Sequence, residues 1–294
     1  MMIVPQSLFE LAHVNILLAD GLACVIAKKV FSSEPENEKY LSAHAITVVI
    51  NGEMRIESHS GQITNIGPKQ MVFLPKGLYM ISDILPNENP FEALIFFFDE
   101  AVIDEYIKVA KWEDYQPTCM PFMVMKRTQS IDTYIDTLIS LYGDMSGRHH
   151  SITRSKLLEL LHLISLTEQG RDFGHAIFCM RNKPKQSIKE LMNSNFDKPL
   201  GIADYAYLSG RSISSFHRDF KRLYNQSPKK WLIARRIEKS IHLIDQNEWS
   251  ITSLAMEVGY KNVSHFIKAF RQKVGISPKQ YHLEKRRKGL IQSI

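Results

Sequence analysis

The chain has little cysteine and no long hydrophobic segment. Its three cysteines, Cys24, Cys119 and Cys179, are odd in number and widely separated among 294 residues, which argues against a disulfide framework and favours a reducing compartment. The longest apolar runs, such as residues 93–98, fall far short of the roughly 20 residues that cross a bilayer. The first residues lack a basic segment followed by an apolar one, so we expect no signal peptide and a cytoplasmic protein without a membrane segment.

The sequence also lacks the patterns that mark catalytic and metal sites. It contains no catalytic triad pattern, phosphate-binding loop or cofactor fingerprint, and we therefore predict neither enzymatic activity nor a cofactor. His44 and His59 are isolated, without the closely spaced partners that a metal site requires. His149 and His150 lie between two helical patterns, where we expect an exposed turn and no metal site.

Charge is distributed unevenly along the chain. Residues 187–294 carry 20 lysines and arginines against nine acidic residues, whereas residues 1–186 carry 17 against 22. The C-terminal part is therefore strongly basic and the N-terminal part mildly acidic, although the whole chain has a net charge of only +6. This asymmetry indicates that the C-terminal part alone meets a polyanion such as nucleic acid.

The segment 250–282 has the pattern of two helices joined by a tight turn. Gly259 ends the first helix, since glycine adopts the left-handed conformation without strain, and Asn262 can cap the second. Gly275 and Pro278 end the second helix. The pattern is typical of a helix-turn-helix, whose second helix fits the major groove of DNA; an ordinary helical hairpin is the alternative. Apolar residues recur at helical spacing at Ile251, Leu254, Ala255 and Val258 in the first helix and at Phe266, Phe270 and Val274 in the second.

The same pattern occurs a second time, earlier in the chain. The offset between the two copies is 49 residues up to the turn glycine and 50 afterwards, so the later copy has one extra residue in its turn. Between the copies, apolar residues from Trp231 to Ile244 predict a connecting amphipathic helix. Two recognition helices held by such a helix can enter successive major-groove segments about 34 Å apart. The matching positions of the earlier copy are Asp204, Tyr205, Ala206, Gly210, Ser212, Phe216, Phe220, Lys221, Asn225, Ser227 and Pro228.

With this repeat, residues 187–285 resemble the DNA-binding region of the AraC/XylS family of bacterial transcription regulators. The resemblance implies a transcription factor, commonly an activator, that contacts promoter DNA and RNA polymerase. Two positions depart from the usual family pattern: Tyr205 stands where leucine is common, and His282 where arginine often follows the tyrosine. The residues of the later copy that carry the resemblance are Ile251, Leu254, Ala255, Gly259, Tyr260, Phe266, Phe270, Arg271, Gly275, Ser277, Pro278 and Tyr281.

Residues 1–100 have the pattern of a β-rich domain. Short runs rich in apolar residues are separated by turn residues, which predicts a sandwich or barrel. The turn signals at residues 51–53 and 67–68, followed by residues 73–77, resemble the cupin-type barrel that is common as the sensor half in this family. A buried strand explains the run Phe96–Phe98, although these rings could also line a pocket. The predicted strands are residues 23–30, 46–50, 54–58, 71–74, 79–84 and 91–98.

Residues 101–170 change to helical periodicity. A short helix near residues 102–110 and two longer ones, around residues 131–142 and 157–164, are expected to pack on the barrel. The leucine-rich stripe of the last helix can also pair with its copy in a second chain, and the family resemblance implies a dimer contact in this region, so we predict a homodimer. Residues 171–186 are predicted to be an interdomain linker. The predicted dimer residues are Leu157, Leu158, Leu161 and Ile164.

The outward faces of the two recognition helices carry side chains suited to DNA. Because the paired phenylalanines of each helix face the core, the opposite stripe must face outward. Arg218 is the best candidate for a bidentate bond to guanine, and Ile267 for contact with a thymine methyl group. Basic residues near the helix ends are predicted to touch phosphates and fix the register. The predicted base contacts are Ser214, His217, Arg218, Ser264, Ile267 and Lys268, and the predicted phosphate contacts are Lys221, Arg222, Arg271 and Lys273.

The sequence therefore predicts an α+β protein of two domains: a cupin-like β-barrel or sandwich with flanking helices in residues 1–170, and an all-α double helix-turn-helix in residues 187–294. We predict a DNA-binding transcriptional regulator controlled by a small molecule or a protein partner that acts on the N-terminal domain. Two alternatives remain open at this point: a metal-dependent cupin-type enzyme with an accessory helical domain, and an effector-binding scaffold without DNA recognition.

Overall fold

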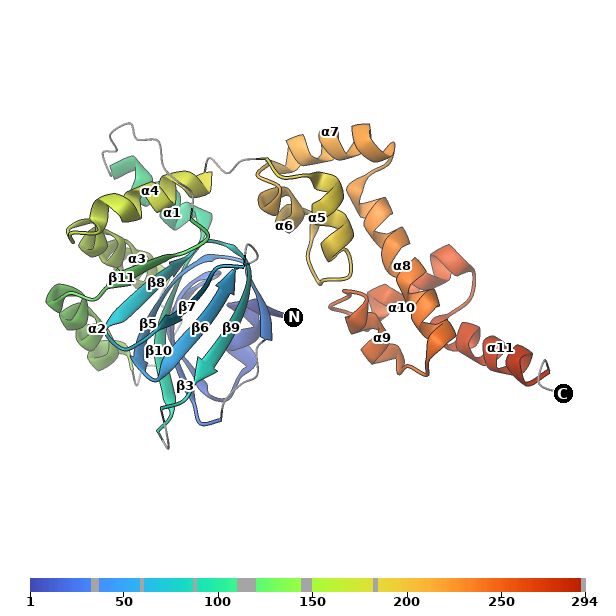
Figure 1. The fold of residues 1–294 in the computed structure, drawn as a ribbon, viewed down its shortest axis with the longest axis horizontal. Helices are drawn as coiled ribbons and strands as arrows, with labels where there is room; N and C mark the ends of the chain where they lie inside the picture. Colours follow the sequence, from blue (N-terminus) through green and yellow to red (C-terminus); the bar gives the residue numbers. More distant parts are fainter. Residues whose placement is uncertain are drawn as a thin grey trace. The chain divides into compact units, whose positions relative to one another are not determined.

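The chain divides into two compact units, Met1–Lys183 and Pro184–Ile294 (Figure 1). The computed structural model describes residues 1–32, 37–58, 61–86, 89–109, 120–143, 150–181 and 185–291. Cys119, His59 and His149 lie outside these residues. Within the described ranges, no helix is long and apolar enough to cross a membrane.

The N-terminal unit is built on two facing β-sheets. The six-stranded sheet has the order β11–β8–β5–β10–β3–β2, and the five-stranded sheet the order β1–β4–β9–β6–β7. β1 pairs with β4 in parallel, and each remaining pair in the two sheets is antiparallel. The six-stranded sheet comprises β2 (Val14–Asp20), β3 (Ala23–Val30), β5 (His44–Asn51), β8 (Gln70–Leu74), β10 (Phe91–Phe98) and β11 (Met123–Lys126). The five-stranded sheet comprises β1 (Met2–Val4), β4 (Asn37–Leu41), β6 (Glu53–Ser58), β7 (Ile63–Ile66) and β9 (Gly77–Ile84), and a short 3₁₀ helix (Gln6–Glu10) follows β1.

The six-stranded sheet is buried on both faces, which explains the near-continuous apolar runs of its strands. Successive side chains of a strand point to opposite faces, and β10 follows this rule. Phe97 packs in the core between the two sheets, whereas Phe96 and Phe98 pack in a second core between this sheet and the helices. The run of three phenylalanines is thus a buried strand, and Phe97 borders a cavity between the two sheets.

Four helices cover the outer face of the six-stranded sheet, as expected for helices packed on a barrel (Figure 1). They are α1 (Glu100–Val109), α2 (Gln129–Tyr142), α3 (His150–Ser165) and α4 (Gly170–Arg181). The predicted linker over residues 171–186 is wrong for most of its length, because residues 171–181 belong to helix α4. Phe173, Ile177 and Met180 of this helix are buried in the core. The division between the two units falls at residue 183, so only the last part of residues 171–186 can connect them.

The predicted dimer stripe of α3 is also corrected by the packing. Leu157, Leu161 and Ile164 are fully buried against the sheet and the neighbouring helices of their own unit. Their side chains therefore stabilise this unit and cannot form a contact surface for a second chain. Leu158 is only partly buried, so the leucine-rich periodicity here marks an intramolecular core.

Five strands have no clear signal in the sequence: β1, β2, β4, β7 and β11. They are short, or they lack the alternation of apolar and polar residues that marks a half-buried strand. β4, for example, contains Glu38 and Lys39, and the side chain of Lys39 is nevertheless buried. The six predicted strands are all present, with bounds that agree to within two residues.

In its described residues, the C-terminal unit consists of helices and the turns that connect them. Helix α8 (Pro228–Gln246) lies between two helix-turn-helix units, as the spacing of its apolar residues predicts (Figure 1). Serine or asparagine caps most of the helix starts, because a side-chain oxygen accepts a hydrogen bond from a free backbone N–H of the first turn. The other helices are α5 (Ile188–Asn195), α6 (Ile202–Leu208), α7 (Ile213–Tyr224), α9 (Ile251–Glu257), α10 (Val263–Val274) and α11 (Pro278–Ile291).

Candidate nucleic-acid interface

The two predicted helix-turn-helix units are present as α6–α7 and α9–α10. Gly210 and Gly259 stand in the turns with φ angles of 66° and 86°, a region that glycine enters without steric cost. The side chains of Ser212 and Asn262 then cap α7 and α10: Ser212 Oγ accepts from the Ser215 N–H at 3.2 Å, and Asn262 Oδ1 from the His265 N–H at 3.1 Å.

Both recognition helices end at a residue in the left-handed conformation. Asn225 closes α7 with φ of 50°, and Gly275 closes α10 with φ of 95°. Asparagine is the residue that most readily replaces glycine there, because its short polar side chain tolerates this backbone conformation. The substitution between the two copies therefore conserves the helix stop.

Each recognition helix has one buried and one exposed face. Phe216 and Phe220 of α7, and Phe266 and Phe270 of α10, are fully buried. Ile267 is 37 % exposed, in line with its predicted outward position. The other predicted contact residues, Ser214, His217, Arg218, Lys221, Arg222, Ser264, Lys268, Arg271 and Lys273, are all exposed. The structure thus leaves all ten predicted side chains accessible on two helices.

The departure from the family pattern at Tyr205 has a structural role. Its ring is fully buried in the first unit, and its hydroxyl donates a 2.6 Å hydrogen bond to the carbonyl oxygen of Asn195 at the end of α5. Burial raises the pKa of the Tyr205 phenol, so it remains a donor. The tyrosine fills the position of the usual leucine and also satisfies a helix-terminal carbonyl.

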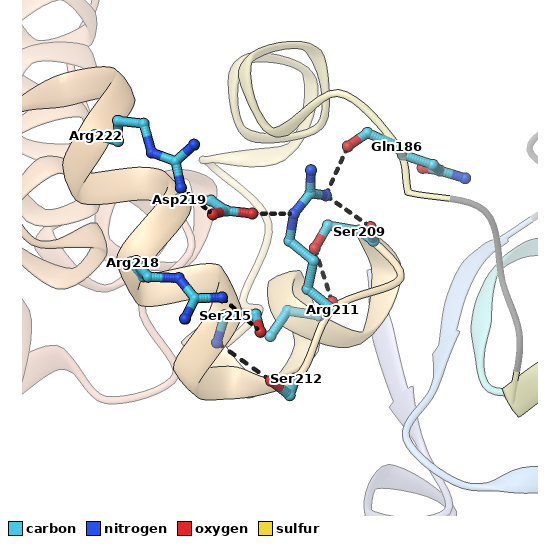
Figure 2. A network of polar contacts seen from close by, with 9 residues as sticks. Gln186, Ser209, Arg211, Ser212, Ser215, Arg218, Asp219 and Arg222 are labelled. Carbon is cyan, nitrogen blue, oxygen red and sulfur yellow. Dashed lines mark hydrogen bonds and ion pairs between the residues drawn. The ribbon is translucent and has the colours of Figure 1, made fainter.

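A polar network centred on Arg211 joins the first turn to the recognition helix (Figure 2). Arg211 Nε donates to Asp219 Oδ2 on α7 at 3.1 Å. Its Nη1 donates to the carbonyl oxygens of Gln186 and Ser209, each at 2.8 Å. One guanidinium therefore fixes the segment before α5, the turn and α7 against one another, a use suited to its planar set of donors.

Asp219 is shared between two arginines. Its Oδ1 accepts a 3.1 Å hydrogen bond from Arg222, while Arg211 binds the other oxygen. The hydrogen bond from Arg211, together with the positive charges of Arg222 and Arg218, holds the pKa of the Asp219 carboxyl below its usual range. Sequence reasoning missed this pair because nothing in the helical spacing links a turn residue to a carboxylate eight positions later.

Part of the predicted basic tail is paired within the unit. Lys285 Nζ lies 2.7 Å from Asp245 Oδ1 of α8. The side chains of residues 286–288 lie outside the described part of the chain. Lys285 therefore ties α11 to α8 and contributes less to a positive surface than its charge alone suggests.

His44 of the N-terminal unit has a structural environment. Its side chain is 3 % exposed, its Nδ1 accepts a 3.0 Å hydrogen bond from the Lys76 N–H, and its Nε2 lies 3.5 Å from Glu100. Among the described residues, no group of three or more histidine, cysteine or acidic side chains is placed to hold a metal ion. His44 thus fits the reading of a hydrogen-bonded histidine next to β8.

A small, partly open cavity of about 40 Å³ lies between the two sheets. Its lining is mainly apolar but includes Lys28 and Asp83, which form a buried ion pair between β3 and β9, and also Lys39. A space of this size holds about one or two water molecules, whereas sites for small organic ligands measure roughly 300–1,000 Å³. This cavity is too small for such a ligand.

Comparison with known families divides the chain in the same way as the structure. Residues 44–176 match the ExsA N-terminal regulatory domain. Residues 205–284 match a helix-turn-helix domain. The second match runs from within α6 into α11, and so contains all ten predicted DNA-contacting residues.

Individual proteins are similar to this chain over most of its length. The thermoregulatory protein LcrF of Yersinia pestis is 23 % identical over 249 residues, which cover 83 % of this chain and 90 % of LcrF. The virulence regulon transcriptional activator VirF of Yersinia enterocolitica is 22 % identical with the same coverage. Among solved structures, an apo variant of ToxT from Vibrio cholerae is 13 % identical and covers 90 % of this chain and 98 % of its own, with a TM-score of 0.46.

Proposed function

Since this chain belongs to the AraC/XylS family of bacterial transcription regulators, we propose that α7 and α10 read promoter DNA as a pair, each from one major-groove segment. The protein is a DNA-binding transcriptional activator whose N-terminal domain has a regulatory role. The observation that carries the proposal is the contrast between the two faces of each helix: paired phenylalanines are buried, and polar or basic residues opposite them are exposed. An exposed basic face on the second helix of each unit is what major-groove docking requires.

The side chains have different roles in this proposal. Ser214, His217 and Arg218 of α7 contact bases, as do Ser264, Ile267 and Lys268 of α10. Lys221, Arg222, Arg271 and Lys273 lie nearer the helix ends and contact phosphates.

Selection from a pool of randomised duplexes tests the reading mode. We expect the full-length protein to enrich two short sequence blocks about one helical turn apart, and its affinity to fall steeply with salt. Arg218→Ala should cost about 1–3 kcal/mol of binding and relax preference at one position, whereas Lys273→Ala should weaken all sequences alike and reduce the salt slope by about one. Enrichment of a single block, or none, would contradict paired reading.

We propose that the effector acts on the outside of the N-terminal unit and is a protein partner. The small volume of the barrel cavity supports this choice over a small molecule bound inside the barrel. DNA affinity of the full-length protein, measured with the protein fraction or the small-molecule fraction of a cell extract, tests it. We expect a change with the protein fraction and none for residues 184–294 alone. A response to the small-molecule fraction would contradict the choice of a protein partner.

A homodimer and a contact with RNA polymerase complete the proposal. The dimer would use the outer surface around α3 and α4, where Leu166, just after α3, is 85 % and Phe178 of α4 47 % exposed. Sedimentation of Leu166→Glu against the native protein tests this contact, and an unchanged dimer would rule out Leu166 as a contact. Transcription with purified RNA polymerase from a promoter carrying the selected site tests activation.

A further inference from the structure

The two helix-turn-helix units meet at the loop that connects α5 to α6. The turn glycine of the second unit, Gly259, packs against this loop so closely that a Cβ atom there would lie 2.6 Å from the carbonyl oxygen of Asp197 and 2.8 Å from that of Lys198. The two backbones therefore touch without an intervening side chain. Any movement of one unit relative to the other must break this contact.

Arg236 of α8 holds the loop from the other side. Its Nε donates to the carbonyl oxygen of Phe196 at 2.7 Å, and its Nη2 donates to those of Lys198 and Leu200 at 2.6 and 3.2 Å. The same guanidinium lies over the ring of Tyr260, 5.5 Å from its centroid, in the second turn. Arg236 is only 8 % exposed, so these contacts form in a partly desolvated site, where charge-assisted hydrogen bonds are strong.

Lys239, about one helical turn further along α8, adds a second link between the units. Its Nζ lies 2.7 Å from Asp197 Oδ2 in the loop and 3.4 Å from Glu257 Oε1 on α9. The lysine is 24 % exposed and the two carboxylates 31 % and 49 %. This link is therefore more hydrated and weaker than that of Arg236.

The contacts of Arg236 and Lys239 with the loop and the second turn form a clamp. This clamp lies next to the exposed face of α10. Arg236 and Leu200 border an open groove that is also lined by His265 and Lys268 of α10. A shift of the loop would therefore displace the surroundings of a proposed base-contacting residue. Because α8 carries the clamp and also begins just after α7, the position of α10 relative to α7 depends on it.

We propose that Arg236 and Lys239 are positioning residues that fix the separation and angle of α7 and α10, and thereby set the number of base pairs between the two half-sites that the protein accepts. The inference rests on the proposed paired reading of DNA. One inserted base pair moves a half-site by about 3.4 Å and rotates it by about 34°. A rigid pair of helices cannot follow this change. The loss of binding free energy at a wrong spacing can therefore be no larger than the energy needed to loosen the clamp.

Binding to a series of duplexes tests the proposal. The full-length protein is titrated with the selected site and with versions that have one base pair removed or one or two added between the blocks. The native protein should lose about tenfold or more in affinity at each wrong spacing. Lys239→Met should bind the native spacing more weakly and show a penalty that is roughly two- to fivefold smaller, the range that partly exposed ion pairs support.

Arg236→Lys keeps the positive charge but loses the planar set of donors, and it should reduce the spacing penalty further than Lys239→Met. Lys230→Gln is the matched control, because it removes one positive charge from the same helix at an exposed side chain. Lys230 lies six positions before Arg236, where its backbone N–H donates to Ser227 Oγ at the start of α8. It should lower affinity at every spacing alike and leave the penalty unchanged.

The ratio of the affinities for the native and the altered spacing separates a positioning role from a purely stabilising one. Lower stability reduces binding to every duplex by the same factor and leaves this ratio unchanged. An unchanged penalty in folded Lys239→Met would overturn the role of Lys239, and an unchanged penalty in Arg236→Lys as well would overturn the inference. Should Arg236→Lys fail to fold, the result for Lys239→Met decides. Absence of any two-block site for the native protein would instead overturn the proposed paired reading and this inference with it.

Discussion

The two helix-turn-helix units of this chain share their backbone pattern but differ in how the turn is attached to the recognition helix. In the first unit, Arg211 after the turn glycine binds Asp219 of α7. In the second, Tyr260 follows the turn glycine and Ala269 stands at the position of Asp219. Tyr260 packs on Phe266 with ring centroids 5.4 Å apart, and Ala269 is 9 % exposed.

The difference teaches that the turn can be held to the recognition helix by either polar or apolar contacts, provided that the two phenylalanines and the turn geometry remain. It also gives the two turns different surroundings. Arg211 reaches outward to Gln186, next to the connection between the two units of the chain. Tyr260 instead lies under Arg236 of α8. We therefore expect the stability of the first helix-turn-helix unit to depend on charge and pH, and that of the second to depend on packing.

The largest expected effects fall on the shared part of the motif. Phe220→Ala and Phe270→Ala each remove a fully buried ring and should each lower the free energy of unfolding by about 3–5 kcal/mol. Urea unfolding of residues 184–294 measures both. Leu223→Ala, at a side chain that is 60 % exposed, is the control and should change stability by less than about 0.5 kcal/mol. A cost below about 1.5 kcal/mol in one unit alone would show that the two cores are not equivalent.

A pair of glycine substitutions in the second unit should have the next largest effects. Gly259→Ala forces a Cβ against the Asp197 backbone at a φ of +86°, and we expect a cost on the order of 3 kcal/mol from strain and overpacking together. Gly275→Ala has φ of +95° but open space around the Cβ, so about 1–2 kcal/mol of backbone strain is expected. Thermal unfolding of the two variants checks the order, and equal costs would contradict the close contact at Gly259.

Removal of the helix caps should affect both units equally and moderately. Ser212→Ala and Asn262→Ala each leave a backbone N–H of the recognition helix without its side-chain acceptor, at a cost of about 1 kcal/mol. Ser214→Ala, two positions after Ser212 and on the exposed face of α7, should be nearly neutral for stability. Urea unfolding distinguishes these outcomes, and a neutral Asn262→Ala would mean that the extra turn residue supplies another cap.

The smallest effect should be the pH dependence that distinguishes the first unit. Because the pKa of Asp219 is lowered, chiefly by the hydrogen bond from Arg211, its carboxylate stabilises the folded state above the unfolded pKa of about 3.8. This contribution is lost as the pH falls through the lower folded pKa. NMR titration of the Asp219 carboxyl should show a return toward 3.8 in Arg211→Gln. An unshifted titration in the native protein would contradict the pair.

Much of the structure of the two helix-turn-helix units could be predicted from the sequence. The turn glycines, the caps at Ser212 and Asn262 and the buried phenylalanines all stand where the spacing indicates. The N-terminal unit was harder to predict. Strand β4 is partly polar in sequence, and helix α4 carries charged residues in the segment that was expected to be a linker.

The sequence by itself determined the local features of this protein: where helices begin, where they end and which face is apolar. These features depend on residues within a few positions of one another, so one chain segment contains the whole signal. Only the tertiary structure decided which apolar stripe is an internal core, as for Leu157 and Leu161. It also decided that Arg236 and Lys239 hold a loop about 40 residues earlier in the chain. Contacts of this kind form when the folded chain brings distant groups together, and no spacing rule connects them in advance.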